Sequence, residues 1–453
     1  MKKFLFVLAL VLCLGLSAFA LDGEGTQESP FIIECEEELA LLHDFPDCYF
    51  NLGCDIELTE AWTTVGTLGD AFSAVFDGCG YTISNFKGGT AIGLFSTNKG
   101  TIKNLNLEWT EEEEYIYTKS YSSNYNRGIL CNENSGIIEN CSVSGNINLN
   151  ITTSYELYFG GIVGTNSGTI QNSTVDITLD VTNPKTNDRL YLGGITGEND
   201  GPSSSKSAVI DKCSAFIDLL CSGFSYRYVG GISASSVDTA SYSKISNCYV
   251  IGSVSGGNLV YGIAYSGTIS NCYASVSGTK YGITYYSSYA KVTNSYYDKT
   301  VSGNTDTGYG EPKATAAMKM KLTYTKGGWD FDNVWGISKE INDGYPYLLW
   351  EYPEKEEDVL TETQAYEHDG KLVFDVSIYA NAPSKLTQIG LYGEGGRFIR
   401  SFMVPNLDSK KDITVVMDNE EDAVSAKIFV WENTESIKPL AECEEVQIVR
   451  SEA

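Results

Sequence analysis

The sequence predicts an all-β chain: a parallel β-helix, or solenoid, followed by a small C-terminal β-sandwich. One short phrase occurs seven times between Ile92 and Asp298, as a Gly-hydrophobic step, a turn with Gly or Ser, and then Ile-x-Asn-Cys/Ser-x-Val. Its clearest copy is Gly160 to Val175, and the others start at intervals of roughly twenty to forty residues. Such a period indicates a solenoid, because one unit cannot bury its apolar face alone and a stack of units can.

The first twenty residues predict a secretory signal peptide. Lys2 and Lys3 precede an apolar run over 4–16, and an A-x-A cleavage signal follows at 18–20. The run is too short to span a bilayer, although a retained anchor is the alternative. No later apolar stretch is long enough for a transmembrane segment. We therefore expect a secreted, extracellular or cell-surface-associated protein.

Residues 21–88 read as an N-terminal cap and the entry strands of the β-helix. The residue patterns predict a strand over 29–33, a helix over 36–43, strands over 48–52 and 55–58, and a strand, tight Asp-Gly turn and strand over 74–86. A solenoid needs an end that closes the stack, and an amphipathic helix serves that purpose.

Residues 89–350 contain the repeats, whose alternation predicts continuous aliphatic columns. One column follows the last glycine of each opening and comprises Leu94, Ile129, Ile162, Ile195, Ile232, Ile263 and Ile283. A second lies two residues before the Asn position and comprises Ile102, Ile138, Ile170, Ile210, Ile245, Ile269 and Val292. A third lies two residues after the Cys/Ser position and comprises Val143, Val175, Ala215, Val250 and Ala274. Stacked coil on coil, these columns form the core.

The Asn position predicts a corner. It lies between two inward residues that are only three apart, so the chain must bend there, and Asn tolerates the left-handed backbone that a bend requires. A vertical ladder of these side chains also allows amide hydrogen bonds between coils. The position is occupied by Asn104, Asn140, Asn172, Asn247, Asn271 and Asn294, with Lys212 as the exception. Glycine pairs such as Gly160-Gly161 mark a second corner, where close approach excludes a Cβ.

The Cys/Ser position predicts a ladder of buried thiols and not a disulfide framework. It holds Cys141, Cys213, Cys248 and Cys272, while Ser173 and Ser295 stand there in other copies, so small size is what the position requires. Cys35, Cys48, Cys54 and Cys79 precede the repeats, and one or two disulfides among them are left open. Zinc is disfavoured, since no C-x-x-C pair exists and the histidines are His43 and His368.

The repeat fades after Asp298. A helix is expected over 314–322, and large aromatic residues over 328–350 are expected to seal the last coil of the 89–350 region. Residues 351–358 form a charged linker. The remaining residues, 359–453, read as a β-sandwich, with strands expected over 371–378, 387–392, 411–417 and 425–431.

The phrase Gly161-Ile162-Val163-Gly164 followed by Asn166-Ser167-Gly168-Thr169-Ile170 resembles the GLUG motif of bacterial surface proteins. The entry segment and the exit Gly328-Trp329-Asp330-Phe331 are similar to what flanks such repeats. The resemblance covers roughly residues 29–350. It implies a right-handed β-helix of the kind found in secreted or surface adhesins and beside the catalytic domain of IgA-cleaving metallopeptidases.

Charge and composition exclude several functions. The net charge of −28 repels phosphate backbones, so no nucleic-acid partner is expected. A metallopeptidase needs H-E-x-x-H and a serine triad needs a His base, and His43 and His368 provide neither arrangement. We expect no catalytic residues, no metal ligands and no cofactor. Calcium, which takes carboxylate oxygens, is the alternative suggested by the acidity.

A polysaccharide lyase or hydrolase is the enzymatic alternative, because both use parallel β-helix scaffolds. A hydrolase needs two carboxylates facing one cleft, and candidates are Asp176, Asp180 and Asp211. A lyase commonly needs a basic residue and calcium. Arg127, Arg189 and Arg227 lie at similar places in successive units, so the spacing allows them to line up on one face.

Tyrosines at corresponding places predict an aromatic column. Tyr158, Tyr191 and Tyr228 all stand three residues before the aligned glycine, flanked by Tyr261 and Tyr281. One interpretation is aromatic stacking between coils, and the other is a strip that binds an extracellular glycan or protein. The leading hypothesis is a non-enzymatic repeat protein for adhesion or ligand binding, with an enzyme or a structural stalk as alternatives. Recognition is expected where the copies differ.

Overall fold

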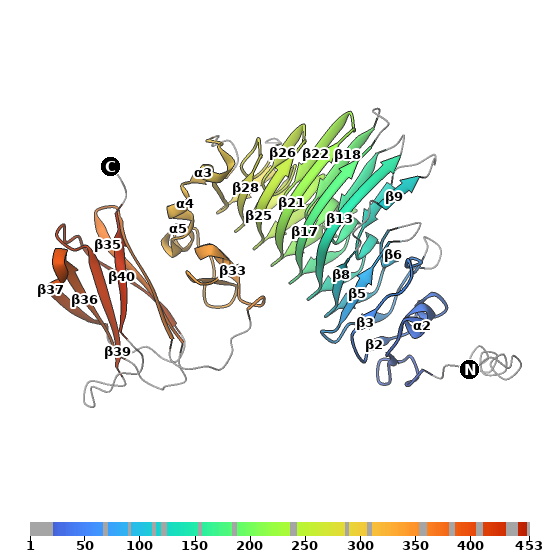
Figure 1. The fold of residues 1–453 in the computed structure, drawn as a ribbon, viewed down its shortest axis with the longest axis horizontal. Coiled ribbons are helices and arrows are strands. Elements are labelled where there is room, and N and C mark those ends of the chain that lie inside the picture. Colours follow the sequence, from blue (N-terminus) through green and yellow to red (C-terminus); the bar gives the residue numbers. More distant parts are fainter. Residues whose placement is uncertain are drawn as a thin grey trace, which may run out of the picture. The chain divides into compact units, whose positions relative to one another are not determined.

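The computed structural model describes residues 21–66, 71–88, 92–110, 115–118, 125–152, 156–183, 188–235, 242–285, 290–305, 310–352, 360–379, 386–404, 411–431 and 443–450. The chain divides into two compact units, Met1–Thr315 and Ala316–Ala453, drawn in Figure 1. The predicted signal peptide, residues 1–20, and most of the predicted linker lie outside the described residues.

The first unit is a parallel β-helix, which confirms the predicted fold class (Figure 1). Its strands stack into four parallel sheets, which we number 1 to 4. Sheet 1 comprises β1 (Phe31–Ile33), β2 (Phe50–Leu52), β4 (Val75–Asp77), β7 (Thr101–Lys103), β12 (Ile137–Glu139), β16 (Thr169–Gln171), β20 (Ala208–Asp211), β24 (Ser243–Ser246), β27 (Gly267–Ser270) and β29 (Ala290–Thr293). Sheet 2 comprises β3 (Ile56–Glu57), β5 (Thr82–Phe86), β8 (Asn106–Trp109), β13 (Ser142–Thr152), β17 (Thr174–Thr182), β21 (Ser214–Ser222), β25 (Tyr249–Ser255), β28 (Tyr273–Ser277), β30 (Tyr296–Asp298) and β31 (Glu311–Lys313), with β9 (Tyr115–Thr118) beside β13.

The two shorter sheets complete each coil between the end of sheet 2 and the start of sheet 1. Sheet 3 comprises β10 (Tyr125–Gly128), β14 (Leu157–Gly160), β18 (Arg189–Gly193), β22 (Tyr226–Gly230) and β26 (Leu259–Tyr261). Sheet 4 comprises β6 (Phe95–Asn98), β11 (Cys131–Asn134), β15 (Val163–Asn166), β19 (Thr196–Asn199) and β23 (Ser233–Ser235). A full coil therefore runs through sheets 3, 4, 1 and 2 in that order.

Asparagines form the corner between sheets 1 and 2. The φ angles there are 52° at Asn104, 50° at Asn140, 45° at Asn172, 50° at Asn247, 51° at Asn271 and 47° at Asn294, and Lys212 has 52°. All are left-handed, a conformation that costs Asn less than most residues. The amide groups also join coils, because Asn140 Nδ2 donates to Asn104 Oδ1 at 3.1 Å and Asn271 Nδ2 donates to Asn247 Oδ1 at 3.4 Å. The bend that the residue spacing predicts is therefore present in every repeat.

The aliphatic columns form one continuous core through the first unit. Ile102, Ile138, Ile170, Ile210, Ile245, Ile269 and Val292 lie in register along sheet 1. Along the corner between sheets 3 and 4, the backbone N–H of Ile162, Ile195 and Ile232 each donates to the carbonyl of the corresponding isoleucine one coil on, ending at Ile263. Val143, Val175, Ala215, Val250 and Ala274 form the third column, on sheet 2.

One assignment within these columns is corrected. Gly128 pairs with Gly160 and Cys131 pairs with Val163, so Leu130, and not Ile129, corresponds to Ile162. The physical reason is the glycine contact: a Cβ on Gly128 would lie 2.3 Å from the Cys131 carbonyl oxygen, and the same clash occurs at Gly160. The residue without a Cβ sets the register, and the choice between two buried aliphatic residues follows from it.

The entry segment already belongs to the coil. The expected helix over 36–43 is present as α2 (Glu36–Leu39) followed by a 3₁₀ turn over Ala40–His43, with Leu39 and Leu42 buried. The predicted strand, Asp-Gly turn and strand correspond to β4 and β5. These two strands pair with different sheets, so the turn between them is a coil corner.

In the second unit, the terminal region is a β-sandwich. Its strands are β34 (Leu360–His368), β35 (Lys371–Tyr379), β36 (Leu386–Gly393), β37 (Arg397–Val404), β38 (Lys411–Asp418), β39 (Ser425–Trp431) and β40 (Glu444–Val449). Strands β34, β35 and β38 form one layer, and β37, β36, β39 and β40 form the other. A parallel pair of only two rungs, between β34 and β40, joins the layers, and both contribute to one apolar core.

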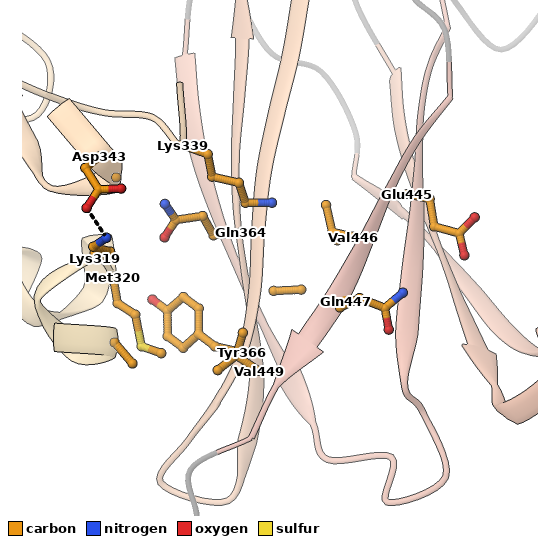
Figure 2. A pocket seen from close by; sticks show the side chains of 13 residues that line it. Lys319, Met320, Lys339, Asp343, Gln364, Tyr366, Glu445, Val446, Gln447 and Val449 are labelled. Atoms are coloured by element: carbon orange, nitrogen blue, oxygen red, sulfur yellow. Dashed lines mark hydrogen bonds and ion pairs between the residues drawn. The ribbon is translucent and has the colours of Figure 1, made fainter. Parts of the chain in front are cut away.

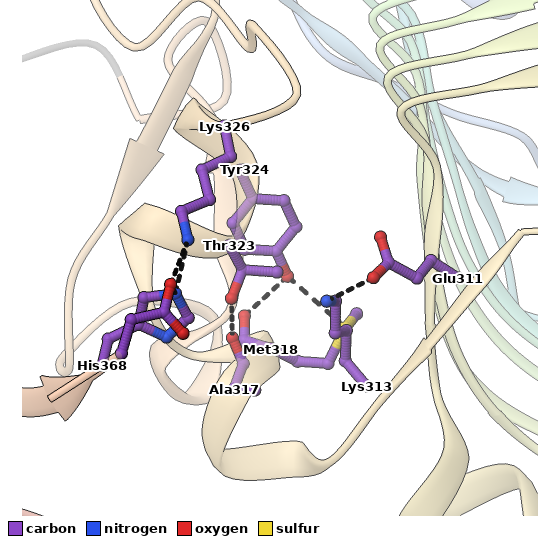
Figure 3. A network of polar contacts seen from close by, with 9 residues as sticks. Glu311, Lys313, Ala317, Met318, Thr323, Tyr324, Lys326 and His368 are labelled. Atoms are coloured by element: carbon purple, nitrogen blue, oxygen red, sulfur yellow. Dashed lines mark hydrogen bonds and ion pairs between the residues drawn. The ribbon is translucent and has the colours of Figure 1, made fainter.

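Residues 316–352 group with the sandwich in the second compact unit, and from the sequence we expect them at the end of the repeat region. The expected helix over 314–322 is wrong in detail, since it breaks into α4 (Thr315–Met318) and α5 (Lys321–Thr325) at the extended Met320. The break is held by side chains, because Tyr324 Oη donates to the Met318 carbonyl at 2.6 Å and Thr323 Oγ1 donates to the Ala317 carbonyl at 2.6 Å (Figure 3).

This segment also contains the antiparallel pair β32 (Trp335–Ile337) and β33 (Pro346–Leu348). The short helix α3 (Lys299–Ser302) precedes the segment and belongs to the first unit. Lys326 ties the segment to the β34–β35 turn, with its Nζ 2.6 Å from His368 Nε2 and 3.2 Å from Asp369 Oδ2 (Figure 3).

Candidate functional site

The Cys/Ser position lies in the core as a column of free thiols. Cys141, Cys213, Cys248 and Cys272 are buried, as are Ser173 and Ser295 in the same column. Each of the six side chains donates to the carbonyl two residues before it, at 3.0–3.3 Å from the sulfur of the cysteines, 2.8 Å for Ser173 and 2.9 Å for Ser295. Cys and Ser alternate because both are small donors to the same acceptor. Burial raises the pKa of Cys141 to about 12, so its thiol is held in the unreactive form.

The four early cysteines, whose pairing the sequence left open, are free thiols in the structure. Cys54 Sγ donates to the Glu34 carbonyl at 3.2 Å, and burial raises the pKa of Cys48. The first unit is therefore held together by stacking and hydrogen bonds within the described residues.

A second asparagine ladder, which sequence reasoning missed, lies inside the coil. Asn98, Asn134, Asn166 and Asn199 are fully buried on sheet 4, and each Nδ2 donates at 2.8 Å to the Oδ1 of the next, with Asn199 donating to Ser243 Oγ at 2.7 Å. The sequence signal for it is the Asn-x-Gly of each copy, because Oδ1 also accepts from the glycine two residues on, as at Gly168 (3.2 Å). These amides satisfy one another and leave nothing for a ligand.

Tyr158, Tyr191 and Tyr228 form the expected column on the outer face of sheet 3. The ring centroids of Tyr158 and Tyr191 lie 4.5 Å apart with planes 4° from parallel, and those of Tyr191 and Tyr228 lie 4.9 Å apart at 10°. All three rings are partly exposed. Because the faces of Tyr191 are covered by its neighbours, the column presents ring edges and hydroxyls outward.

Tyr261 and Tyr281 do not continue this column. Leu259 pairs with Tyr228, while Tyr261 pairs with Gly230 and is buried, with its hydroxyl donating to the Ala234 carbonyl. The reason is that Tyr261 takes the place of the first glycine of the pair at this corner. The aromatic surface instead continues onto Tyr265, whose ring is edge-on to Tyr228 at 6.3 Å, and then to Tyr285 at 5.5 Å.

The backbones of sheets 3 and 4 approach each other closely at two glycines. A Cβ on Gly197 of β19 would lie 2.5 Å from the Phe159 nitrogen of β14, and a Cβ on Gly164 of β15 would lie 2.3 Å from the Arg127 nitrogen of β10. Strands β15 and β19 of sheet 4 therefore each pack against the sheet 3 strand of the preceding coil. This contact brings Glu198, the residue after Gly197, beside Tyr158.

The hydroxyl of Tyr158 lies among carboxylates. It donates to Glu156 Oε2 at 3.1 Å, and Glu156 Oε1 accepts from Arg189 Nη1 at 3.0 Å. Burial, followed by the charges of Asp200 and Glu156, raises the pKa of Glu198 to about 7. Burial also raises the pKa of Tyr158, with the charge of Glu198 next in effect. We call Glu156, Tyr158, Tyr191, Glu198 and Tyr228 the tyrosine–carboxylate site.

Two polar groups at this site have no hydrogen-bond partner among the described residues: the Glu198 carboxylate and the buried Thr165 hydroxyl. Thr165 and Glu198 are neighbours in one column of sheet 4, and Glu133 precedes them in the same column. Glu133 is satisfied, since Asn126 Nδ2 donates to its Oε1 at 2.9 Å. Buried polar groups are ordinarily paired, so the unpaired ones make this place a candidate for contact with an outside group.

The other candidate residues from the sequence, three aspartates and three arginines, do not lie together at one site. Asp176 and Asp180 lie on β17 of sheet 2, while Asp211 lies on β20 of sheet 1, where it accepts from Ser246 and Asn247. The three arginines do not line up either. Arg127 corresponds to Phe159, Arg189 pairs with Tyr226, and Arg227 pairs with Leu190, because the insertions before the glycine corner differ in length. Of the three, Arg189 alone joins the tyrosine–carboxylate site.

Glu156, Glu198 and Asp200 were missed by sequence reasoning. A signal for Glu198 exists: the residue before the buried asparagine is Thr97 and Thr165 in two coils but Glu133 and Glu198 in the others. That column is one of those that differ between copies. The closeness of Glu198 to Tyr158 follows from the close approach of sheets 3 and 4 at Gly197, which no local pattern encodes.

Among the described residues, no group of three or more His, Cys, Asp and Glu side chains is arranged to hold a metal ion. The helices in the described ranges are all too short or too polar to cross a bilayer.

No family model matches the chain. Among curated proteins it is similar to one from Evansella cellulosilytica named "Putative Gly-rich membrane protein", with 29% identity over 409 residues. That alignment covers 73% of this chain and 46% of the relative, so the chain spans about half the length of that protein.

Proposed function

We propose that this chain is a secreted or surface-associated, non-enzymatic β-helix protein that binds an extracellular glycan through the tyrosine–carboxylate site. The observation that carries the proposal is the row of tyrosine edges and hydroxyls beside the unpaired groups of Glu198 and Thr165. The GLUG-like repeats and the signal-like first twenty residues support the location, and so does the word membrane in the name of the relative.

The spacing of the site favours a polymer. Neighbouring strands of a sheet lie about 4.8 Å apart, so the hydroxyls of Tyr158, Tyr191 and Tyr228 repeat at that interval along the coil axis. Donors and acceptors at a short regular interval suit a chain that presents hydroxyls periodically, as a polysaccharide does. The ring faces are covered by one another, so we expect hydrogen bonds from ring edges, Glu198 and Thr165 to contribute more than stacking of sugar faces.

The test is a screen of neutral, acidic and amino polysaccharides against the full chain, followed by titration of the best ligand. Tyr191→Ala removes the central ring and is expected to weaken binding at least about tenfold, equivalent to roughly 1.4 kcal/mol. Tyr81→Ala, which removes an exposed tyrosine elsewhere on the first unit, is the matched control and should leave affinity unchanged. Equal affinity of the folded Tyr191→Ala variant and the wild type would refute the site.

A glycoside hydrolase is the second candidate, and Glu198 is the observation in its favour. A hydrolase of this class pairs a carboxylic acid of raised pKa with a second carboxylate. Glu198 has such a pKa, and Glu156 lies close enough to contribute to it. If the chain is a hydrolase, the wild type releases reducing ends from the bound polysaccharide, whereas Glu198→Gln and Glu156→Gln bind it without cleavage. Binding without any release of reducing ends supports the non-enzymatic proposal.

A further inference from the structure

A cavity of about 520 Å³ lies in the second unit, over the seam between β34 and β40 (Figure 2). Its floor includes outward-facing side chains of the two strands, among them Gln364 and Tyr366 of β34 and Gln447 of β40. Its roof comes from residues 316–344, which contribute Lys319, Met320, Lys339 and Asp343. This volume is in the range of pockets that hold small molecules.

The seam is open because the strands pair over only two rungs, Ala365 with Ile448 and Tyr366 with Val449. Where a further rung would form, the Thr363 N–H donates instead to Glu444 Oε1 at 3.1 Å. The floor is rigid nevertheless, since the buried Tyr366 hydroxyl donates to Asp375 Oδ2 at 2.8 Å and accepts from the Leu322 N–H at 3.2 Å. Tyr366 is therefore held in place on one side of the cavity.

The charges around the cavity are unevenly satisfied. Asp343 is paired with Lys319 at 2.8 Å, and Glu445 is paired with Lys427 at 3.3 Å. Lys339 makes no hydrogen bond or ion pair within the described residues, and neither do the amide groups of Gln364 and Gln447. Both acids are thus neutralised in place, while one ammonium group and two amides remain available.

The lining also has an apolar part. Met320, Val446 and Val449 line the cavity, together with Ala316 and Ala365 (Figure 2). An ammonium group and amide donors beside an apolar wall recognise a carboxylate that carries a hydrocarbon tail, because each part of such a ligand finds a matching surface.

We infer that this cavity binds a small organic carboxylate, with its anionic head at Lys339, Gln364 and Gln447 and its apolar tail against Met320 and Val449. Glu444 is the acid nearest to compete for Lys339; burial raises the Glu444 pKa, and the charge of Lys339 lowers it by less. Its Oε1 accepts from the Thr363 N–H, its buried Oε2 has no hydrogen-bond partner among the described residues, and Glu444 does not line the cavity. The inference is independent of the glycan site, which lies on the first unit.

The experiment titrates the full chain with hexanoate and measures binding by isothermal titration calorimetry or ligand-observed NMR. Hexanol, which has a hydrocarbon tail of the same length, is the neutral probe. Hexanoate should bind saturably and at least about tenfold more tightly than hexanol. Lys339→Met should reduce the hexanoate affinity to that of hexanol. Lys371→Met, which removes an exposed lysine paired with Asp418 on the sandwich, is the matched control and should change nothing.

Three results would overturn the inference: no saturable binding of hexanoate, equal binding of hexanoate and hexanol, or unchanged hexanoate affinity in Lys339→Met. A second variant guards against a misplaced site, since Gln447→Trp fills the floor and should abolish binding while leaving the unfolding midpoint near that of the wild type. Tyr191→Ala, which alters the glycan site, should leave hexanoate binding intact.

Discussion

The interior of the coil and the junction of its two short sheets follow opposite rules. Inside, Asn134, Asn166 and Asn199 occur at the same place in successive coils, and each satisfies the next. At the junction, Thr165 and Glu198 share one column but differ in chemistry, and both keep polar groups without a hydrogen-bond partner among the described residues. Repetition thus satisfies the buried asparagines, whereas these two positions, where the coils differ, keep unpaired groups.

The largest expected effect is a loss of stability when one rung of the interior asparagine ladder is removed. Inside the core, Asn166→Ala deprives Asn134 Nδ2 of its shortest acceptor and Asn199 Oδ1 of its donor. It also deprives the Gly168 N–H of its side-chain acceptor. Each unsatisfied buried group costs roughly 1–3 kcal/mol, so we expect a loss of about 4 kcal/mol in the free energy of unfolding. Urea denaturation measures it. Asn172→Gly, at the left-handed corner, is the control and should shift the same quantity by less than about 1 kcal/mol, because glycine adopts positive φ freely.

The next largest effect is the pH dependence that Glu198 imposes. Its folded-state pKa of about 7 lies above the ordinary value for a glutamate, so the folded chain binds a proton that the unfolded chain has released. The stability contribution is complete below about pH 4.5 and is lost as the pH rises through about 7. The loss amounts to up to about 3 kcal/mol at 1.36 kcal/mol per pKa unit.

Glu198→Gln should flatten this profile and be more stable than the wild type at pH 8, as followed by thermal unfolding across pH 4–8. Glu133→Gln, in the same column but bonded to Asn126, is the matched control and should keep the wild-type slope. An unchanged slope in Glu198→Gln would show that Glu198 is not the desolvated group.

Much of the coil interior can be predicted from the sequence. The Ile, Asn and Cys/Ser positions recur at fixed offsets, and a local pattern is sufficient to assign inward columns and corners. The register of Ile129 was wrong because two adjacent aliphatic residues are equally apolar, and only the glycine contact distinguishes them. Glu198 was not identified because its neighbour Tyr158 belongs to the preceding coil and a different sheet. Contacts across a corner depend on backbone approach, which a one-dimensional pattern does not record.

A smaller effect is expected in the tyrosine column. Tyr191→Ala removes two stacked ring contacts, each worth roughly 0.5–1.5 kcal/mol, so the unfolding free energy should fall by about 2 kcal/mol. The measurement is a urea titration alongside Tyr81→Ala. A loss below about 0.5 kcal/mol would mean that the column does not stabilise the coil and that its regularity has another cause.

The smallest effect is expected in the thiol column. Cys213→Ser should change stability by less than about 1 kcal/mol, because serine makes the same bond to the carbonyl two residues back in other coils. A thiol reagent should label the exposed Cys79 and Cys443 in the native chain and leave Cys141, Cys213, Cys248 and Cys272 unmodified until the chain unfolds. Rapid labelling of the buried four would contradict the assigned column.

The most direct test of the central claim is the affinity of one polysaccharide ligand for three chains: the wild type, Glu198→Ala and Asn172→Gly. If recognition lies where the coils differ, Glu198→Ala, altered in a column that differs between coils, binds at least about tenfold more weakly, and Asn172→Gly, altered at a repeated corner, binds as the wild type does. The claim is contradicted if Asn172→Gly loses binding while folded, or if Glu198→Ala retains it.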